Sequence, residues 1–344
     1  MIFVIPDDPF IHYFSNRKNM RIFALHTSQD FAEKVADFLD RSLDSLEERN
    51  FEDGEHKIRP LVSVRDEDVY VVHALYADER ESVNDKLCKL LFFIATLKDA
   101  GAKRVTAVVP YLCYARKDRR TKARDPVTSR YVATLFEAVR VDTIVTIEVH
   151  NLQAYQNAFH CQSENLVAYQ LFVSYFLSVL QKDEQVVVMS PDIGGVKRAE
   201  QFRDRLAKGL AADVDMAFME KIRSKGIVSG ETVVGNVNRK TVIIIDDLIN
   251  SGSTIARAAA ACGKLGALKV YAVATHGVFN KKAKEALREK SLTSIIVTNT
   301  VNTATLDETF FKNKLVVLDV SPLFAETIRR LNSGGSIVSL MDIE

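Results

Sequence analysis

The feature that most constrains the fold is a regular alternation of short β-branched apolar runs with segments of helical periodicity. The predicted strands are Arg21–Leu25, Asp68–Ala74, Arg104–Pro110, Thr143–Val149, Gln185–Ser190, Val214–Met219, Thr241–Ile245, Lys269–Thr275, Ser294–Thr298 and Leu315–Val320. The predicted helices are Ser28–Leu43, Ser82–Ala100, Ser129–Arg140, Glu164–Gln181, Gly194–Lys208, Ser251–Leu265, Lys281–Lys290 and Pro322–Asn332. Apolar strands separated by helices are typical of parallel sheets covered on both faces. The pattern runs twice, with a seam around residues 151–170, so we predict two α/β domains, each with a mainly parallel sheet flanked by helices.

Size and charge limit the classes of function. The 344 residues are enough for two domains of about 150 residues each. The 46 basic and 45 acidic side chains give a net charge of +1. Nucleic-acid-binding and membrane-surface proteins need a net basic face, so this balance argues against both classes.

Cysteine usage and hydropathy indicate the compartment. The four cysteines are far apart and form no C-x-x-C pair, which argues against a disulfide framework or a zinc knuckle and favours a reducing compartment. The longest apolar run, near Leu87–Leu97, contains Lys89 and is too short to span a bilayer. The N-terminal residues lack the basic start and apolar stretch of a signal peptide. We therefore expect a cytoplasmic protein without a membrane partner.

The strongest chemical signal lies in residues 241–254. An apolar strand ends there in two adjacent carboxylates, and a polar turn then opens an alanine-rich helix; the residues are Asp246, Asp247, Asn250, Ser251, Gly252, Ser253 and Thr254. Hydroxyls and backbone N–H groups at a helix N-terminus form a cradle for phosphate. The carboxylates would repel a phosphate, so we assign them to ribose hydroxyls, directly or through Mg²⁺. The alternative is a strand end with an Asx-turn and a helix cap.

A second segment, residues 109–120, follows a predicted strand and carries several cations behind an aromatic pair. Arg116, Lys117, Arg119 and Arg120 supply the charges, and Asp118 lies among them. Arginine suits a polyphosphate because its planar fork binds two oxygens at once. Taken alone, the segment could equally be a solvated basic loop.

Three further positions carry weaker signals. Phe51–Glu55 could be a core aromatic followed by a hairpin turn at Asp53-Gly54. His150, just past a predicted strand, could be a structural histidine. Asp192 lies in Ser190–Gly195, where two glycines let the backbone approach a ligand and the carboxylate offers the hard oxygen that Mg²⁺ prefers.

The last candidate segment, residues 218–226, leaves a predicted strand and carries three cations within five residues. Lys221, Arg223 and Lys225 supply them, and Gly226 follows. A flexible loop of this composition could close over phosphates as a lid. The alternative is a solvated extension of the strand.

Together these motifs resemble one family. Residues 241–254 resemble the phosphoribosyl-pyrophosphate loop shared by type I phosphoribosyltransferases and the pyrophosphokinases that make their substrate. The pattern Pro-Tyr-x-x-Tyr-Ala-Arg-x-Asp-Arg, which starts at Pro110, looks like the ATP-binding loop of ribose-phosphate pyrophosphokinases, and Phe51–Glu55 resembles their Phe-x-Asp-Gly-Glu element. The resemblance runs from about residue 20 to the C-terminus and includes Val234–Val237, Ala274–His276 and Ala325–Arg330.

The resemblance implies a role for each motif. ATP would be bound by Phe51, Asp53, Glu55, Arg116, Lys117, Asp118 and His150, with the Phe51 ring on the adenine. Ribose 5-phosphate would be bound by Asp192, Asp246, Asp247, Asn250, Ser251, Gly252, Ser253 and Thr254. His150 and Asp192 would contact Mg²⁺, with the imidazole as the weaker or water-mediated ligand because Mg²⁺ prefers oxygen. Lys221 and Arg223 match the Lys-x-Arg of the family's catalytic flexible loop.

The chain departs from the family pattern at three of these positions. Asn250 stands where the family usually has aspartate, Ser253 where it has a glycine, and Lys117 where it has glutamine. Asn250 removes one negative charge near the reacting sugar hydroxyl and keeps the turn chemistry. Lys117 adds a cation near the ATP phosphates.

The resemblance implies two type I phosphoribosyltransferase-like domains. We expect an ATP-binding domain at residues 1–166, to which residues 322–344 could return, and a ribose 5-phosphate-binding domain at residues 167–321. The implied reaction moves the β,γ-diphosphate of ATP to the 1-hydroxyl of ribose 5-phosphate, with Mg²⁺ as cofactor. We also expect a homo-oligomer built from dimers, with a hexamer as one form, and no nucleic-acid partner. The alternatives are a non-catalytic regulatory paralogue and a type I phosphoribosyltransferase.

Overall fold

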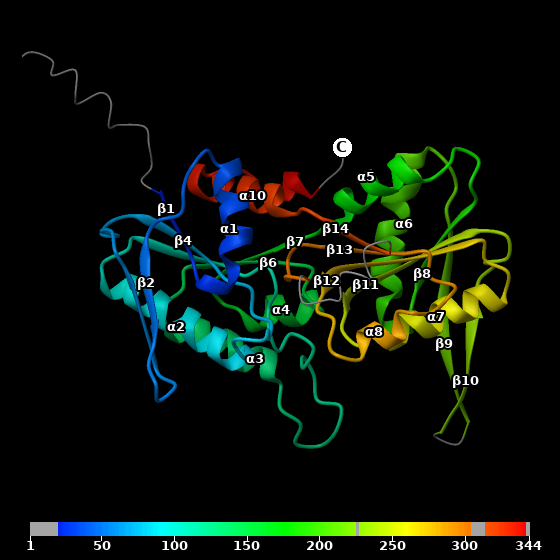
Figure 1. Cartoon of the computed structure of the whole chain (residues 1–344), viewed down its shortest axis with the longest axis horizontal. Coiled ribbons are helices and arrows are strands. Elements are labelled where there is room, and N and C mark those ends of the chain that lie inside the picture. The colour runs from blue at the N-terminus through cyan, green and yellow to red at the C-terminus, as the bar shows by residue number, and fades with distance from the viewer. Residues whose placement is uncertain (1–19, 225–226, 304–313, 342–344) are drawn as a thin grey trace, which may run out of the picture.

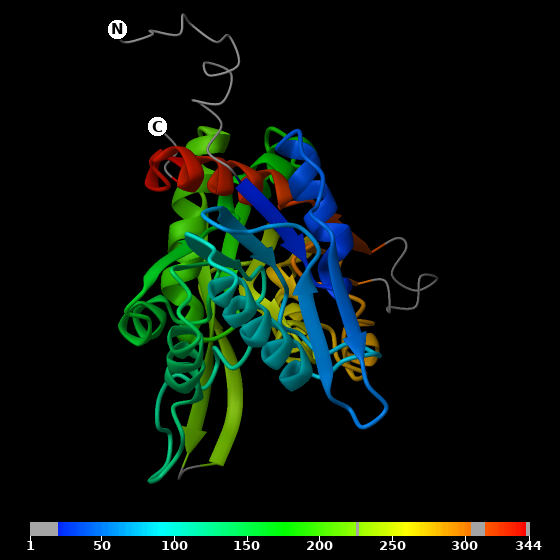
Figure 2. The same ribbon diagram turned by 90° about the vertical axis from the view of Figure 1, so that its left-hand side faces the viewer.

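The computed structural model of the chain describes residues 20–224, 227–303 and 314–341, and of residues 221–231 it describes no side chain. No helix within these ranges is long and apolar enough to cross a membrane. Figure 1 shows two sheets side by side with helices on their faces, and Figure 2 shows the same molecule from the side of the first sheet.

The first sheet is entirely parallel. Its described strands have the order β1-β4-β5-β6-β7, with bounds Met20–Ala24, Asp68–Val72, Arg104–Val108, Thr143–Ile147 and Gln162–Leu166. The helices between them are α1 (Gln29–Phe38), α2 (Val83–Asp99), α3 (Thr128–Ala138) and α4 (Leu152–Ala158). Every residue of β6 is buried, because helices cover both faces of the sheet. This burial is why the strand reads as an uninterrupted β-branched run.

A separate two-stranded antiparallel hairpin interrupts the alternation. It consists of β2 (Leu46–Asn50) and β3 (His56–Pro60), and residues 51–55 form its turn. In Figures 1 and 2 it extends to the same side of the molecule as the loop between β5 and α3. The helix and strand pattern did not predict these two strands, since half of their residues are charged.

The second sheet is parallel except for its edge strand β10. Within the described residues its order is β10-β9-β8-β11-β12-β13-β14, and only β10 and β9 pair antiparallel. The bounds are β8 Val186–Ser190, β9 Asp215–Ser224, β10 Ile227–Val234, β11 Thr241–Ile249, β12 Lys269–Gly277, β13 Ser294–Thr298 and β14 Leu315–Leu318. The helices are α5 (Tyr169–Val179), α6 (Val196–Leu210), α7 (Ser253–Lys264), α8 (Ala283–Ala286) and α10 (Ser321–Ser333). Short 3-10 turns lie at His26–Ser28, Ile193–Gly195 and Val338–Leu340.

The last helix lies against the first sheet's helices, whereas the last strand does not leave the second sheet. Strand β14 pairs with β13. Helix α10 packs on α1, where the rings of Phe31 and Phe324 meet edge to face at 5.4 Å between centroids. Arg104 Nη2 also donates to the carbonyl of Leu331 at 2.9 Å. The division of the chain at residues 166 and 167, which falls between β7 and α5, stays a prediction.

Several predicted elements differ in their bounds; the predicted helices Ser28–Leu43 and Lys281–Lys290, for example, are Gln29–Phe38 and Ala283–Ala286. Two of the differences come from strand pairing. The predicted helix Glu164–Gln181 begins only at Tyr169, because residues 162–166 pair with β6 as the edge strand β7. The predicted strand Val214–Met219 continues to Ser224, because β10 pairs with it antiparallel. In both cases a neighbouring strand, which sequence periodicity does not reveal, decides the conformation.

Candidate active site

Strands from the two sheets end close together, and the side chains that follow them form the centre of the candidate site. His150 follows β6, Asp247 lies near the end of β11, and His150 Nδ1 is 2.8 Å from Asp247 Oδ2. Arg198, in the first turn of α6, has Nη1 at 3.3 Å from Asp246 Oδ1 and 3.5 Å from Asp247 Oδ1. A second link lies nearby, where His276 Nε2 is 3.1 Å from the carbonyl oxygen of Ile147.

The two adjacent carboxylates differ in their electrostatics. Burial and the neighbouring charge of Asp247 raise the pKa of Asp246 well above its usual value. Burial alone would raise the pKa of Asp247 too, but the hydrogen bond with His150 and the charge of Arg198 outweigh it and hold that pKa below its usual range. The same hydrogen bond raises the pKa of His150. Asp247 is therefore the carboxylate that keeps its negative charge to lower pH.

The turn after β11 has the geometry of an anion cradle. Gly252 has a φ of +70°, in the left-handed region, and a Cβ at this position would lie 2.8 Å from Cγ of Leu287. Ser251 Oγ and Ser253 Oγ are 2.9 Å apart at the start of α7. The carbonyl of Asn250 accepts the backbone N–H of Asn280 at 2.9 Å, which ties the turn to the segment after β12. Hydroxyls thus gather at a helix N-terminus directly after Asp246 and Asp247.

A cavity of about 450 Å³ lies between the ends of β5, β6, β11 and β12. The predicted residues in its wall are Arg116, Lys117, His150 and Asp247. Tyr111, Tyr114, Leu75, Val83, Glu148 and His276 also line it. The basic segment, the histidine and the second of the paired carboxylates therefore share one cavity, although they lie up to 131 residues apart in the sequence.

Two residues of the basic segment have partners inside the protein. Lys117 Nζ is 2.8 Å from Asp125 Oδ2, so part of its charge is neutralised within the loop. Asp118 Oδ2 accepts the side-chain amide of Asn151 at 2.5 Å, which places this loop beside the start of α4. Arg116 is exposed in the wall of the cavity.

Asp192 and the predicted lid lie on the same half of the molecule as the anion cradle. Asp192 Oδ1 accepts the N–H of Gly195 at 3.0 Å and caps the 3-10 turn there, which leaves its other carboxylate oxygen for a ligand. Lys221 and Arg223 lie on β9, where their backbones pair with Glu231 and Val228. The predicted flexible loop is thus a β-ribbon at these two positions, and their side chains lie outside the described residues.

The hairpin residues do not line the 450 Å³ cavity. Phe51 is 40% exposed, and its ring contacts the guanidinium of Arg49 at 5.1 Å from the ring centroid. Asp53 Oδ1 accepts the N–H of Glu55 at 3.0 Å, which closes the turn. Phe51 is therefore a surface residue at the tip of a hairpin, and its interpretation as a core residue is wrong.

The donor set fits Mg²⁺ that arrives with a substrate better than a resident ion. Among the described residues, no three His, Cys, Asp or Glu side chains are grouped so that they could hold a metal ion. Mg²⁺ is typically bound by one or two carboxylates together with substrate phosphates. Asp192 and Asp247 can supply such oxygens, whereas His150 Nδ1 is already engaged by Asp247.

Sequence reasoning missed three residues of this site. Arg198 bridges the two carboxylates, and its signal was a cation in the first turn after the glycines of residues 194–195. Glu148 is buried with a φ of +46°, and its Oε1 accepts the N–H of Ala168 at 3.2 Å. Burial raises the pKa of Glu148 to about 7, although the charge of Arg198 opposes this shift. Burial lowers the pKa of His276 to about 4, so this histidine is a neutral structural group.

A solved structure places the fold in a known class. The crystal structure of phosphoribosylpyrophosphate synthetase from Mycobacterium smegmatis matches with a TM-score of 0.83 and 36% identity, over 92% of this chain and 100% of that chain. The fold is accordingly α/β, built from two type I phosphoribosyltransferase-like domains, each with a mainly parallel sheet flanked by helices.

Sequence comparisons name the family. Residues 20–139 match the N-terminal domain of ribose phosphate pyrophosphokinase, and residues 219–342 match the phosphoribosyl synthetase-associated domain. The ribose-phosphate pyrophosphokinase of Clostridium tetani is 36% identical over 95% of this chain and 98% of its own length, and ribose-phosphate pyrophosphokinase A of Dictyostelium discoideum is 34% identical over 93% and 97%. The chain belongs to the ribose-phosphate pyrophosphokinase family and is an enzyme of that class. No finding favours the non-catalytic paralogue or the phosphoribosyltransferase.

Proposed function

We propose that the enzyme transfers the β,γ-diphosphate of ATP to the 1-hydroxyl of ribose 5-phosphate, giving phosphoribosyl pyrophosphate and AMP, in the site around His150 and Asp247. The 2.8 Å approach of these two side chains carries the proposal, because it brings the ATP-type motifs of the first sheet to the ribose-type motif of the second. Both substrates would then meet where the two sets of strand ends face each other.

Ribose 5-phosphate binds with its phosphate in the turn at residues 251–254. The left-handed Gly252, the two serine hydroxyls and the N-terminus of α7 support this assignment. The sugar hydroxyls then lie toward Asp246 and Asp247, whose carboxylate oxygens accept hydrogen bonds. Asn250 keeps this turn tied to Asn280 through its carbonyl, whichever side chain stands at position 250.

The ATP phosphates occupy the 450 Å³ cavity, beside Arg116, Lys117 and His150. When bound, Mg²⁺ adds positive charge to these phosphates, held in part by Asp192. Lys221 and Arg223 stabilise the charge that builds on the transferring group in the transition state, and the β9–β10 ribbon carries them. Phosphoryl-type transfer needs alignment and charge neutralisation more than covalent chemistry.

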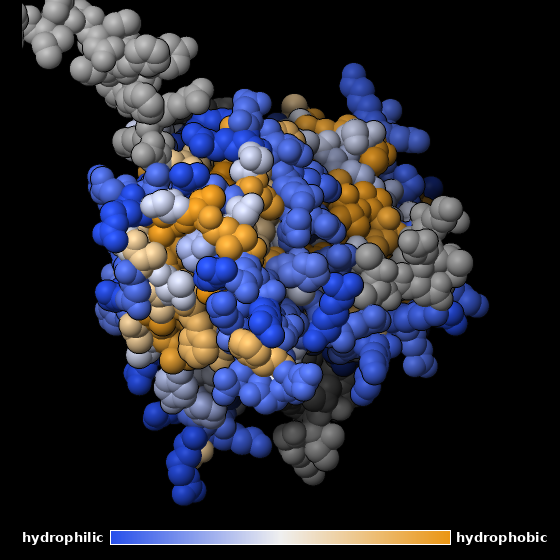
Figure 3. All heavy atoms as spheres, turned by 60° about the vertical axis from the view of Figure 1, so that its left-hand side comes forward, coloured by the Kyte–Doolittle hydropathy of each residue, from blue (hydrophilic) through white to orange (hydrophobic). Residues whose placement is uncertain are grey.

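The adenine is bound by the hairpin turn, through the exposed ring of Phe51 and the carboxylates of Asp53 and Glu55. Because this turn does not line the cavity of its own chain, a homo-oligomer is the arrangement we favour, with the turn serving a neighbouring copy. Figure 3 shows apolar patches among the hydrophilic residues of the face near the first sheet, and Phe92, Tyr131 and Leu135 are among the exposed large apolar side chains of α2 and α3. We place the enzyme in the cytoplasm, because its four cysteines are free, as expected in a reducing compartment.

The product nucleotide tests the reaction type. Purified enzyme with ATP, ribose 5-phosphate and Mg²⁺ should release AMP in step with the consumption of ribose 5-phosphate. ADP as the nucleotide product would refute the proposal, since ADP reports transfer of a single phosphoryl group. The variant Asp247→Asn is the matched test of the site, because it keeps the side-chain shape and removes the charge that holds His150.

A further inference from the structure

The β2–β3 hairpin has two chemically different faces. Register pairs Glu48 with Ile58 and Asn50 with His56, so these side chains share the face toward α2. Ile58 packs in the apolar core of the first half, and the His56 ring stacks on Phe92 of α2 at 5.4 Å. The alternate positions are exposed: Lys57 and Arg59 pair with Glu47 on the outer face. The contacts of the inner face with α2 and the core therefore fix the direction in which the turn at residues 51–55 points.

Glu48 is the charged group on that inner face, and a buried lysine holds it. Lys89 of α2 has only 4% of its side chain exposed, and its Nζ lies 2.8 Å from Glu48 Oε1. Lys89 also pairs with Glu81, in the segment between β4 and α2. The other oxygen of Glu48 accepts the N–H of His26 at 2.9 Å. Charge-assisted contacts therefore connect the hairpin directly to α2 and to the turn at His26, and through Lys89 to the segment that contains Glu81.

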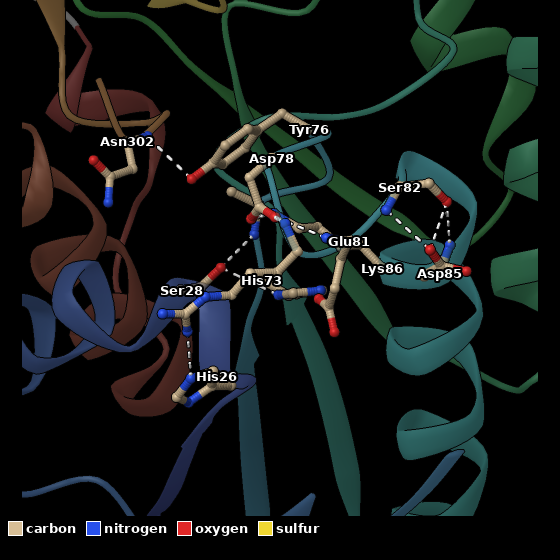
Figure 4. Close-up of polar contacts among 12 residues, drawn as sticks. His26, Ser28, His73, Tyr76, Asp78, Glu81, Ser82, Asp85, Lys86 and Asn302 are labelled. Atoms are coloured by element: carbon tan, nitrogen blue, oxygen red, sulfur yellow. Dashed lines mark hydrogen bonds and ion pairs between the residues drawn. The ribbon is translucent and has the colours of Figure 1, made fainter. Parts of the chain in front are cut away.

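Helix α2 contains a second buried lysine, which contacts the segment between β4 and α2. Figure 4 shows Lys86, Asp78 and Tyr76 grouped beside His73. Lys86 is fully buried, with Nζ at 2.6 Å from Asp78 Oδ2 and 4.0 Å from the Tyr76 ring centroid. The Tyr76 hydroxyl accepts the N–H of Asn302, from the second half, at 3.2 Å.

Residues at both ends of this segment also border the candidate ATP site. Leu75 and Val83 lie in the wall of the 450 Å³ cavity. The hydroxyl of Tyr114, another wall residue, donates to the Asn84 side chain. Lys89 therefore joins Glu48 on the hairpin to Glu81, and the main chain leads within three residues from Glu81 to Val83 and Asn84 at the rim of the cavity.

We propose that Lys89 is a positioning residue for the adenine end of the ATP bound by the neighbouring copy: through Glu48 it fixes the direction of the hairpin turn, and through Glu81 it holds that turn to the segment that borders the phosphate cavity of its own chain. The inference rests on the proposed role of Phe51, Asp53 and Glu55. Lys89 touches no substrate, and it acts by keeping the turn in the orientation that meets the base. An apolar side chain would fill the same buried space without the cost of burying charge, so packing alone does not account for a lysine between two carboxylates.

Steady-state kinetics on the full-length enzyme separate this role from a structural one. Lys89→Met should raise KM for ATP by about tenfold, because the turn is no longer ordered before binding, while kcat at saturating ATP and KM for ribose 5-phosphate stay at parental values. The Kd of a non-hydrolysable ATP analogue, measured by calorimetry, should rise by the same factor. Glu48→Met removes the contact between the hairpin and Lys89 and leaves Lys89 paired with Glu81. This variant therefore tests the proposal if Lys89→Met does not fold.

Lys98→Met is the matched control, since Lys98 lies on the same helix and its Nζ is 2.8 Å from Asp142, away from the hairpin. It should keep the parental KM for ATP. Phe51→Ala tests the adenine assignment separately from the positioning role of Lys89. A raised KM in Phe51→Ala with a parental KM in folded Lys89→Met and Glu48→Met would overturn this inference alone. A parental KM in Phe51→Ala would refute the adenine assignment, and the inference with it.

Discussion

Replacing Glu148 by glutamine removes a buried titratable group from the edge of the active site and keeps the shape of the side chain. The carboxyl of Glu148 is buried, and its Oε1 accepts one backbone hydrogen bond, from Ala168 at 3.2 Å. A glutamine carbonyl oxygen can accept the same hydrogen bond. The substitution therefore isolates the cost of the buried charge.

The magnitude follows from the pKa of Glu148, which burial raises from an ordinary value of 4.5 to about 7. Below pH 4.5 the carboxyl is protonated in both the folded and the unfolded chain and costs nothing. Between pH 4.5 and 7 the unfolded chain loses the proton more readily, so stability falls as pH rises. A shift of this size corresponds to about 3 kcal/mol lost above pH 7. Glu148→Gln should therefore be more stable than the parent at pH 8, by an amount that disappears near pH 4.5.

Thermal unfolding of the parent and of Glu148→Gln at several pH values between 4.5 and 8 measures this difference. The variant's Tm should exceed the parent's by about 6 °C at pH 8, and the two should converge at the acidic end. His73 and His276, whose pKa values burial lowers to about 3 and 4, destabilise both proteins alike below pH 6.5 and cancel in the difference. The exposed Glu33→Gln is the control and should show no pH-dependent gap. A gap for Glu148→Gln that is the same at pH 5 and pH 8 would refute the reasoning.

Two further predictions concern the substrate loops. Gly252→Ala should raise KM for ribose 5-phosphate and destabilise the protein by about 1–2 kcal/mol, because an L-residue is strained at a φ of +70° and the new Cβ meets Leu287. Gly334→Ala, at a φ of +83° with open space around it, should destabilise without changing that KM, and equal KM values in both variants would contradict the cradle assignment. Lys221→Ala and Arg223→Ala should each lower kcat about 100-fold with smaller changes in KM, since a charge that acts in the transition state is lost. Near-parental kcat in both variants would show that these cations are only part of a solvated ribbon.

The sequence alone was enough for the α/β class and for most of the parallel strands. Strands such as β6 and β8 are buried at every position, and only β-branched or apolar runs tolerate that environment. The turn at residues 250–254 was also predictable from the sequence, because Gly252 and the flanking hydroxyls form a local pattern whose geometry needs no distant partner. A motif of this kind depends only on consecutive residues, so the sequence is enough to predict it.

Tertiary structure decided what depends on partners far away in the chain. The pairing of His150 with Asp247 joins residues 97 positions apart, and no spacing rule predicts it. Glu148 and Arg198 gain their roles only when the segment after β6 meets the first turn of α6. The polar β7 became a strand because β6 offered an edge, and the hairpin turn with Phe51 lies outside the cavity that its motif predicted it would serve. Periodicity records which face of an element is buried, whereas the identity of the neighbour that buries it is fixed only when the chain has folded.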